Sequence, residues 1–386
     1  MPDIFSIKMP TIVRTETGCR VAARLEAPPF LQELWYEVTG CEPVVDGTPF
    51  AIAALPLAMA KGWDLHCQAP VSGRLLQSFH AIQTILQSWI PGTQRIHCSA
   101  PEHVFSQRHS AAGCFFSGGV DSYYTFLKHQ QSITNHVFIT GFDVPLSKPQ
   151  LAQRISAEMK KIALGFQVNL IEVKTNLREF CDRFVSWRMY HGAALASVAH
   201  LLGNRLGTMY LAATHTYADL FPCGTHPMLD PLWSSEAVEI IHDGCEATRF
   251  EKVAFLAQNP LALKSLRVCY RNKNNELNCG QCEKCLRTMI SLYSLNVLDQ
   301  CESFDKQLDP KLIARMRLGD NPRILMYVQE NLEALKERRD SQHVISAVER
   351  SMRRPSMLRK LNKQAKPLFR KSTYLKLFGS ETSQSS

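Results

Sequence analysis

The chain has 386 residues, of which 45% are hydrophobic and 20% are charged, and its formal net charge is +9. A chain of this length holds two or three domains and buries a core without disulfide or metal staples. Its composition excludes collagen-like, wholly disordered and small disulfide-bonded proteins. No apolar run approaches the roughly 20 residues that cross a bilayer, and Asp3 and Lys8 interrupt any apolar targeting segment. We therefore expect a cytoplasmic protein without a transmembrane segment.

Residues 1–108 are expected to form an N-terminal mixed α/β region of unknown role. Ile4–Met9 and Ile12–Val13 have the composition of short strands, and apolar residues recur at helical spacing over Leu75–Trp89. The Pro91-Gly92 pair ends that helix. We find no catalytic motif in this region.

Strands and helices alternate in residues 109–300, which is the pattern of a parallel sheet covered by helices on both faces. The expected strands are Gly113–Phe116, His136–Phe142, Gln167–Val173 and Met209–Thr214. The expected helices are Asp121–His129, Gln150–Leu164, Ala193–Leu202, Ser234–Ile241, Lys252–Gln258 and Leu286–Leu298. The alternation predicts a doubly wound parallel α/β sheet, in which ligands bind at the carboxyl ends of the strands.

The positive charge is concentrated in residues 301–386, which we expect to form a helical, basic C-terminal tail. They hold 18 of the 44 Lys and Arg residues and 10 of the 35 Asp and Glu residues, so they carry about +8 and the first 300 residues about +1. Expected helices are Lys311–Leu318 and Asn321–Arg339. Residues 350–380 contain ten basic residues and no acidic one. They predict either a solvated tail or a surface for a polyanion, such as RNA in a tRNA-modifying protein or an anionic lipid.

The clearest motif is Ser117-Gly118-Gly119-Val120-Asp121-Ser122, which follows the first expected strand of this sheet and opens a helix. Two glycines let the backbone turn tightly and approach a ligand. The amides would point at one spot, the positive end of the helix dipole, and the serine hydroxyls add donors. Asp121 would repel a bare pyrophosphate, which indicates a bridging Mg²⁺. The segment therefore predicts a polyphosphate site, with an incidental strand–turn–helix junction as the alternative.

This segment resembles the Ser-Gly-Gly-x-Asp-Ser loop of the PP-loop ATP pyrophosphatases at every specified position. The resemblance implies that ATP is cleaved between its α and β phosphates to adenylate a substrate. Asp143 falls where the family holds adenine and ribose, so it is a nucleotide contact or a plain turn residue. Lys252 falls where the family carries a lysine that holds the leaving pyrophosphate, and a surface lysine is the alternative.

Four of the thirteen cysteines form a C-x9-C-x2-C-x2-C cluster, namely Cys269, Cys279, Cys282 and Cys285. Each Cys-x-x-Cys step places two sulfurs on one ion, and Gly280 allows the tight turn between them. Four thiolates without an open position are typical of a structural Zn²⁺ site. An iron–sulfur cluster, a redox pair and four thiols without metal are the alternatives.

The loop and the cysteine cluster together resemble the 7-cyano-7-deazaguanine synthase family over residues 112–295. Cys269-Tyr270, the Cys-Gly-x-Cys-x-x-Cys stretch from residue 279 and Arg287 all fit that pattern. The resemblance implies a ligase that uses ATP, Mg²⁺ and a structural Zn²⁺ to convert a small carboxylic acid into an amide and then a nitrile, with ammonia as nitrogen donor. Whether the chain forms a homodimer is left open.

The chain departs from that family at the substrate end. Met189-Tyr190-His191-Gly192 replaces a Pro-Gly-Arg-Asn stretch of the family, and residues 214–227 are unlike its substrate loop. His191 takes the arginine-like position, where it could bind an anion or transfer a proton, so it joins Asp121 and Lys252 as a candidate catalytic residue. Further candidates for this end, all expected in loops, are Tyr190, His215, His226 and Asp230. Cys223 is a candidate nucleophile without a visible activating partner. For each, a structural or surface role is the alternative. We therefore expect the same activating chemistry on a different acceptor.

Overall fold

The computed structural model describes residues 3–103, 108–272, 276–305, 307–318 and 322–353. The chain divides into two compact units, the first with residues 1–279 and 300–304 and the second with residues 280–299 and 305 onward. Within the described ranges, no helix combines the length and the hydropathy of a membrane crossing. Most of the basic segment 350–380, for which we predicted either a solvated tail or a surface for a polyanion, lies outside the described residues.

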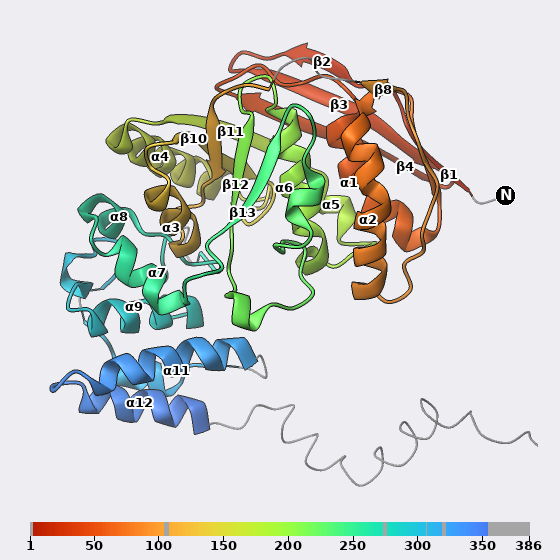
Figure 1. Cartoon of the computed structure of the whole chain (residues 1–386). Coiled ribbons are helices and arrows are strands. Elements are labelled where there is room, and N and C mark those ends of the chain that lie inside the picture. The colour runs from red at the N-terminus through yellow and green to blue at the C-terminus, as the bar shows by residue number, and fades with distance from the viewer. Residues whose placement is uncertain (1–2, 104–107, 273–275, 306, 319–321, 354–386) are drawn as a thin grey trace, which may run out of the picture. The chain divides into compact units, whose positions relative to one another are not determined.

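The first unit is built on a sheet of eleven strands, in which five neighbouring strands form a continuous parallel block (Figure 1). These five are β9 (Ala112–Phe115), β10 (Ile133–Thr140), β11 (Asn169–Thr175), β12 (Thr208–Ala212) and β13 (Glu239–Asp243). They lie side by side in the order β13-β12-β9-β10-β11 and all pair in parallel. The order reverses between β9 and β12, so the carboxyl ends of these two strands flank the switch point at which doubly wound sheets bind ligands.

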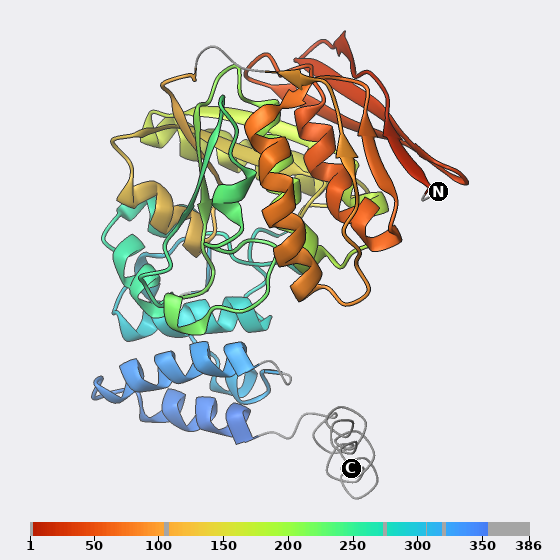
Figure 2. The ribbon, with the colours of Figure 1, turned by 45° about the vertical axis from the view of Figure 1, so that its right-hand side comes forward.

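Helices connect the first four of these strands along the chain and cover both faces of this part of the sheet, namely α3 (Val120–Lys128), α4 (Pro149–Phe166), α5 (Leu177–Cys181) and α6 (Trp187–Leu201). Two further helices, α7 (Arg249–Leu256) and α8 (Pro260–Ser265), follow β13. Figures 1 and 2 show α3 and α4 on one side of the strands and α6 on the other. The predicted α/β class with a mostly parallel central sheet is therefore confirmed.

Strands of the N-terminal region extend the same sheet. β4 (Phe30–Thr39) pairs antiparallel with β11, and β3 (Cys19–Ala27) pairs with β4. The other elements of this region are β1 (Ile4–Ile7), β2 (Thr11–Arg14), α1 (Thr48–Lys61), β5 (Asp64–Cys67), β6 (Val71–Ser72), α2 (Gly73–Trp89), β7 (Cys98–Ser99) and β8 (Glu102–His103). The helix predicted at Leu75–Trp89 corresponds to α2, whereas α1 was not predicted.

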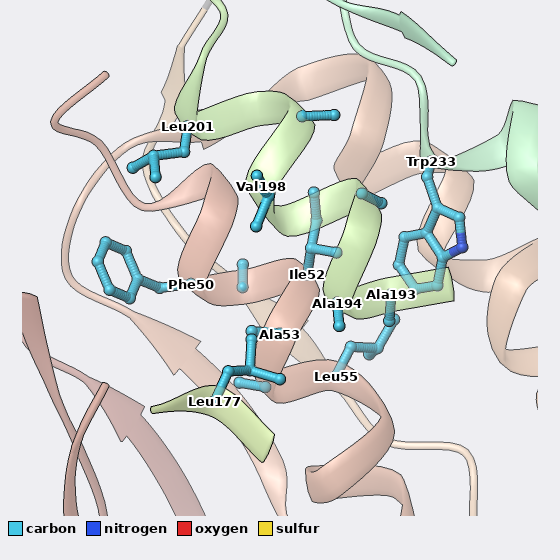
Figure 3. Packing of buried hydrophobic residues seen from close by; sticks show 14 of the residues in the cluster. Phe50, Ile52, Ala53, Leu55, Leu177, Ala193, Ala194, Val198, Leu201 and Trp233 are labelled. Atoms are coloured by element: carbon cyan, nitrogen blue, oxygen red, sulfur yellow. The ribbon is translucent and has the colours of Figure 1, made fainter. Parts of the chain in front are cut away.

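The core of the first unit forms where α1 packs on α6. Nearly every side chain of α1 is buried, because this helix is apolar all around its circumference. Figure 3 shows Phe50, Ile52 and Leu55 of α1 among side chains of α6, with Trp233 at the edge of the cluster. The Tyr190 hydroxyl of α6 donates a hydrogen bond to the Ala53 carbonyl oxygen at 2.6 Å, so the two helices are also joined by a polar contact.

Two predictions for this unit are wrong. The segment Ser234–Ile241 is not a helix, because it leads from the short 3₁₀ helix η2 (Asp230–Trp233) into β13. The Ser235 hydroxyl accepts from the amides of Ala237 and Val238, and the Ser234 hydroxyl accepts from Ile240, so these amides are unavailable to helix carbonyls.

The loop predicted around Tyr190 and His191 is also wrong, because α6 already begins at Trp187. The first turn of this helix is partly polar, which hides it from a search for apolar periodicity. Other short elements of the chain are the 3₁₀ helices η1 (Tyr217–Asp219) and η4 (Leu298–Gln300).

The second unit is helical, in agreement with the prediction for the C-terminal residues that the structure describes. Its helices are α9 (Glu283–Ser294), α10 (Pro310–Ala314), α11 (Pro322–Lys336) and α12 (Gln342–Arg353). They share an apolar core that includes Ile290, Val328 and Val348. Arg287 of α9 is buried, forms an ion pair with Glu283 at 2.7 Å and lies over the Tyr327 ring, so it has a structural role here.

Packing of α1 can be tested with two leucines of opposite exposure. Leu55→Ala should lower the free energy of unfolding by about 2–5 kcal/mol, because Leu55 is fully buried and its removal leaves a cavity. Leu164→Ala is the matched control. Leu164 is 81% exposed, so this substitution should lower the free energy of unfolding by less than about 0.5 kcal/mol. All five tryptophans lie in the first unit, so urea unfolding followed by tryptophan fluorescence measures both variants. If both substitutions lower the free energy of unfolding by the same amount, the packing of α1 is contradicted.

Candidate functional site

The loop Ser117–Ser122 lies at the carboxyl end of β9, beside the switch point of the sheet. Gly118 has a φ of +73°, and a Cβ there would come within 3.2 Å of the Met159 Cε atom, so the turn requires glycine. Gly119 caps α3, and its carbonyl accepts the Ser122 hydroxyl at 3.0 Å. The backbone thus makes the tight strand–loop–helix turn that the two glycines predicted.

Asp121 lies in the first turn of α3 and is surrounded by cations. Its carboxylate accepts from Arg249 at 2.6 Å, and its other oxygen lies 3.8 Å from the Lys252 Nζ atom. Lys252 comes from the first turn of α7, is 1% exposed and donates to the Ala213 carbonyl at 2.7 Å. The interpretation of Lys252 as a surface lysine is therefore wrong. Burial lowers the pKa of Lys252, whereas the charge of Asp121 raises it.

Arg267 is a third cation at the loop, and the sequence analysis missed it. Its amide donates to the Gly118 carbonyl at 2.7 Å, and its guanidinium donates to the Ser117 carbonyl at 3.3 Å. The side chain is buried, and its Nε atom has no hydrogen-bond partner among the described residues. A buried donor without a partner is costly, so this group fits an anion that would bind at the loop.

Asp143 and His191 lie near each other although 48 positions separate them. Asp143 is exposed after β10, and its charge raises the pKa values of both Arg267 and His191. The His191 ring lies between the Trp187 carbonyl oxygen at 3.2 Å and the Thr225 hydroxyl at 3.1 Å. Burial nevertheless lowers the pKa of His191, which favours a neutral ring and hence proton transfer over anion binding.

The remaining predicted residues are held by structural contacts. Tyr190 belongs to the core, His215 packs on Phe221 with ring centres 4.6 Å apart, and the His226 Nδ1 atom accepts from the Met228 amide. The Cys223 thiol donates to the Arg188 carbonyl at 3.6 Å, and burial raises its pKa. Burial outweighs the Thr225 and Gly224 amides and the Arg188 charge, which lower this pKa, so the protonated thiol is favoured over a nucleophilic thiolate.

Asp230 pairs with a histidine that the sequence analysis did not select. Its fully buried carboxylate lies 2.7 Å from the Nδ1 atom of His242, in β13. Burial alone would lower the pKa of His242, but Asp230 and the neighbouring Cys245 thiol outweigh it and raise the pKa to about 9. The signal was a His-x-x-Cys pattern at the end of a strand. It was hidden because this stretch had been predicted to follow a helix.

The four cysteines of the predicted metal site come together. Their sulfur atoms all lie within 4.8 Å of one another, and those of Cys282 and Cys285 are 3.4 Å apart. Tetrahedral coordination with Zn–S bonds of about 2.3 Å places sulfurs about 3.8 Å apart, so the group could hold a metal such as zinc. Gly280 has a φ of +62°, which gives the tight turn expected there, and the Asn272 amide donates to the Cys269 sulfur.

Comparisons with protein-family models, with curated proteins and with solved structures found no match to this chain. Its function therefore has to be argued from the side chains and backbone that meet at the carboxyl ends of β9, β12 and β13.

The cysteine cluster predicts one metal ion per chain. Cys282→Ser should lower metal affinity at least about tenfold, because it removes one of four ligands. Elemental analysis of the purified protein measures its metal content. Competition with a chromogenic chelator measures its metal affinity. Affinity should fall as the pH falls, since the thiolates become protonated. Cys19→Ser, in β3, is the control and should retain the ion. If the purified protein contains no metal although all of its thiols are intact, the metal site is contradicted.

The Asp230–His242 pair predicts a histidine that titrates at high pH. NMR titration should place the pKa of His242 near 9 in the native chain and at a lower value in Asp230→Asn, because the largest contribution that raises it against burial is then removed. The pair contributes stability below pH 6.5 that is lost as the pH rises through 9, by at most about 3 kcal/mol. Asp182→Asn, at a half-exposed position, should leave this titration unchanged. A His242 pKa that is the same in the native chain and in Asp230→Asn would refute the pairing.

Proposed function

We propose that the chain is an ATP-dependent adenylate-forming ligase, similar in chemistry to 7-cyano-7-deazaguanine synthases. It cleaves ATP to AMP and pyrophosphate, adenylates the carboxylate or amide of a small acid, and transfers the activated group to ammonia. The observation that carries the proposal is the buried Arg267 guanidinium, whose Nε atom lacks a partner among the described residues beside a glycine turn and a helix N-terminus. Phosphate oxygens are the acceptors that suit such a group.

The charge at the loop supports a nucleotide rather than a neutral ligand. Three cations, Arg249, Lys252 and Arg267, lie near the loop, where Asp121 pairs with the first two. The charges of Glu246 and Asp143 act on Lys252 and Arg267. Cationic donors gathered at one loop favour an anion that brings several negative oxygens. The α3 amides after Gly119 add the positive end of a helix dipole. The oxygens of a triphosphate can accept from both the cationic side chains and the α3 amides.

The roles of individual residues follow from their positions. Amides of Gly118, Gly119, Val120 and Ser122 bind phosphate oxygens, and Lys252 stabilises the charge that develops on the leaving pyrophosphate. Asp121 would hold Mg²⁺, which would supply charge neutralisation at the phosphates. Asp143 contacts the nucleoside, and His191, as a neutral ring, exchanges a proton with the acceptor. Positioning and charge neutralisation suffice for this step, without covalent help from the loop.

The four-cysteine group has a structural role in this proposal and holds Zn²⁺. Asn278 links it to the nucleotide site, because the Asn278 side chain accepts from the amides of Val268 and Cys269, directly after Arg267. The metal would thus stabilise the segment that presents Arg267 to the loop.

The nucleotide site can be tested through Arg267. Arg267→Gln should weaken MgATP binding about 10–100-fold, which corresponds to the loss of a charged hydrogen-bond donor worth about 1.5–3 kcal/mol. Isothermal titration calorimetry with MgATP measures the change. Arg24→Gln is the matched control, since Arg24 is 66% exposed in β3, and its affinity should equal that of the native chain.

The reaction is tested by its products. With MgATP, ammonium and a panel of small carboxylic acids, AMP and pyrophosphate should form, and Asp121→Asn should abolish them. ADP and orthophosphate as the only products would rule out adenylation, and native protein that does not bind MgATP would rule out the site itself.

A further inference from the structure

The Asn278 side chain holds an irregular stretch of backbone beside the loop. Residues 266–269 follow α8 in an irregular conformation, so their amides and carbonyls need partners from other parts of the chain. The Asn278 Oδ1 atom accepts from the Val268 amide at 2.9 Å and from the Cys269 amide at 3.2 Å. Its Nδ2 atom donates to the Leu266 carbonyl oxygen at 2.8 Å. One carboxamide thus bonds three backbone groups of this stretch.

The hydrogen-bonding capacity of the Asn278 carboxamide is fully used. The Nδ2 atom also donates to the Ser303 carbonyl oxygen at 3.2 Å, so both donors and both lone pairs of Oδ1 are bonded to backbone. The Ser303 hydroxyl donates to the Leu266 carbonyl oxygen at 2.6 Å and holds that carbonyl from a second direction. A side chain with four such bonds has one orientation, so it fixes the backbone that it contacts.

Arg267 lies in the middle of this stretch, and one peptide group joins it to both Asn278 and the loop. The oxygen of the Leu266–Arg267 peptide accepts from Asn278, and the N–H of the same peptide donates to the Gly118 carbonyl at 2.7 Å. Because a trans peptide is planar and its oxygen and hydrogen point in opposite directions, these two bonds align the group from both sides. The Arg267 guanidinium then reaches the Ser117 carbonyl at 3.3 Å.

A second asparagine bonds backbone in a similar way, but in another part of the first unit. The Asn176 side chain accepts from the Trp35 amide at 3.1 Å and donates to the Glu33 carbonyl oxygen at 2.8 Å, where β11 pairs with β4. The strands β10 and β11 separate β4 from β9, which leads into the loop. Asn176 therefore fixes backbone as Asn278 does without a direct path to Arg267, which makes it a matched control.

We propose that Asn278 is a positioning residue that raises the affinity of the loop for MgATP through Arg267. This inference rests on the proposed function, because that function supplies the nucleotide. Asn278 acts indirectly, since it holds the backbone from which the Arg267 amide and guanidinium reach the loop. Its removal lets Arg267 adopt conformations that do not fit the anion, and the free energy needed to order Arg267 is then taken from binding.

A double-mutant cycle on the full, zinc-loaded chain tests this path. Asn278→Ala should weaken MgATP binding about tenfold, and Arg267→Gln should weaken it at least as much. If Asn278 acts through Arg267, the double variant binds no more weakly than Arg267→Gln alone, because the contact that Asn278 supports is already gone. Isothermal titration calorimetry measures the four affinities. Two losses that multiply in the double variant overturn the proposal, as does an unchanged affinity in Asn278→Ala.

Two controls separate this role from a general effect on the fold or on the metal. Asn176→Ala removes a comparable set of backbone contacts and should leave the MgATP affinity unchanged. Elemental analysis of Asn278→Ala checks the neighbouring Cys279, a member of the four-cysteine group. If affinity falls only in preparations that have lost Zn²⁺, the effect belongs to the cysteines and the proposal is overturned.

A measurement on the native chain covers the case in which Asn278→Ala does not fold. Hydrogen exchange followed by NMR should show protected amides at Val268 and Cys269, and MgATP should slow their exchange by a larger factor than it slows exchange at Trp35. This expectation follows because coupling between two sites is reciprocal. Exchange at Val268 and Cys269 that MgATP does not slow beyond that at Trp35 overturns the proposal without any variant.

Failure of this inference can be told apart from failure of the proposed function. If the native chain binds MgATP but the losses in the cycle multiply, Asn278 is refuted as a positioning residue and the nucleotide site stands. If the native chain does not bind MgATP although the Val268 and Cys269 amides are protected, Asn278 is a structural clamp only and the nucleotide function itself is refuted.

Discussion

The ion pairs that Asp121 makes with Arg249 and Lys252 join the parts on which the candidate site depends. One carboxylate in the first turn of α3 holds a guanidinium and a buried ammonium, both from α7, against the switch point of the sheet. Without that carboxylate, two cations would be largely desolvated beside a positive helix end, which is costly. The pairing therefore places α7 against the loop, and with it Lys252 and the strand end that leads to Cys245.

Arg267 adds a charge that these pairs do not balance. Its backbone amide donates to the Gly118 carbonyl and its guanidinium donates to the Ser117 carbonyl, which orients the charge but cannot neutralise it. A site with spare buried positive charge binds anions, and a glycine turn followed by a helix N-terminus gives that anion amide donors as well.

The four-cysteine group bears on this site through the chain segment that connects them. Arg267 precedes Cys269 by two residues, and the Asn278 side chain accepts from the backbone amides of Val268 and Cys269. Four sulfurs held together by one ion would limit the motion of this segment, since metal ligation fixes the backbone around it. The four-cysteine group and the proposed nucleotide site are thus joined by a few residues of chain, so a metal bound by the cysteines would stabilise the segment that carries Arg267.

The sequence by itself determined the local features whose physics is short-range. The loop from Ser117 to Ser122, the turn at Gly280 and the alternation of strands with helices depend on neighbours along the chain, so spacing and residue type were enough to predict them. Only the tertiary structure decided which distant side chains meet. Arg249 and Arg267 lie far from the loop in sequence, and their roles come from burial and ion pairing, for which a single sequence carries no periodic signal. His242 was hidden for a related reason: serine hydroxyls turned the preceding segment out of the helix that its pattern favoured, and β13 then carried His242 to the carboxyl edge of the sheet.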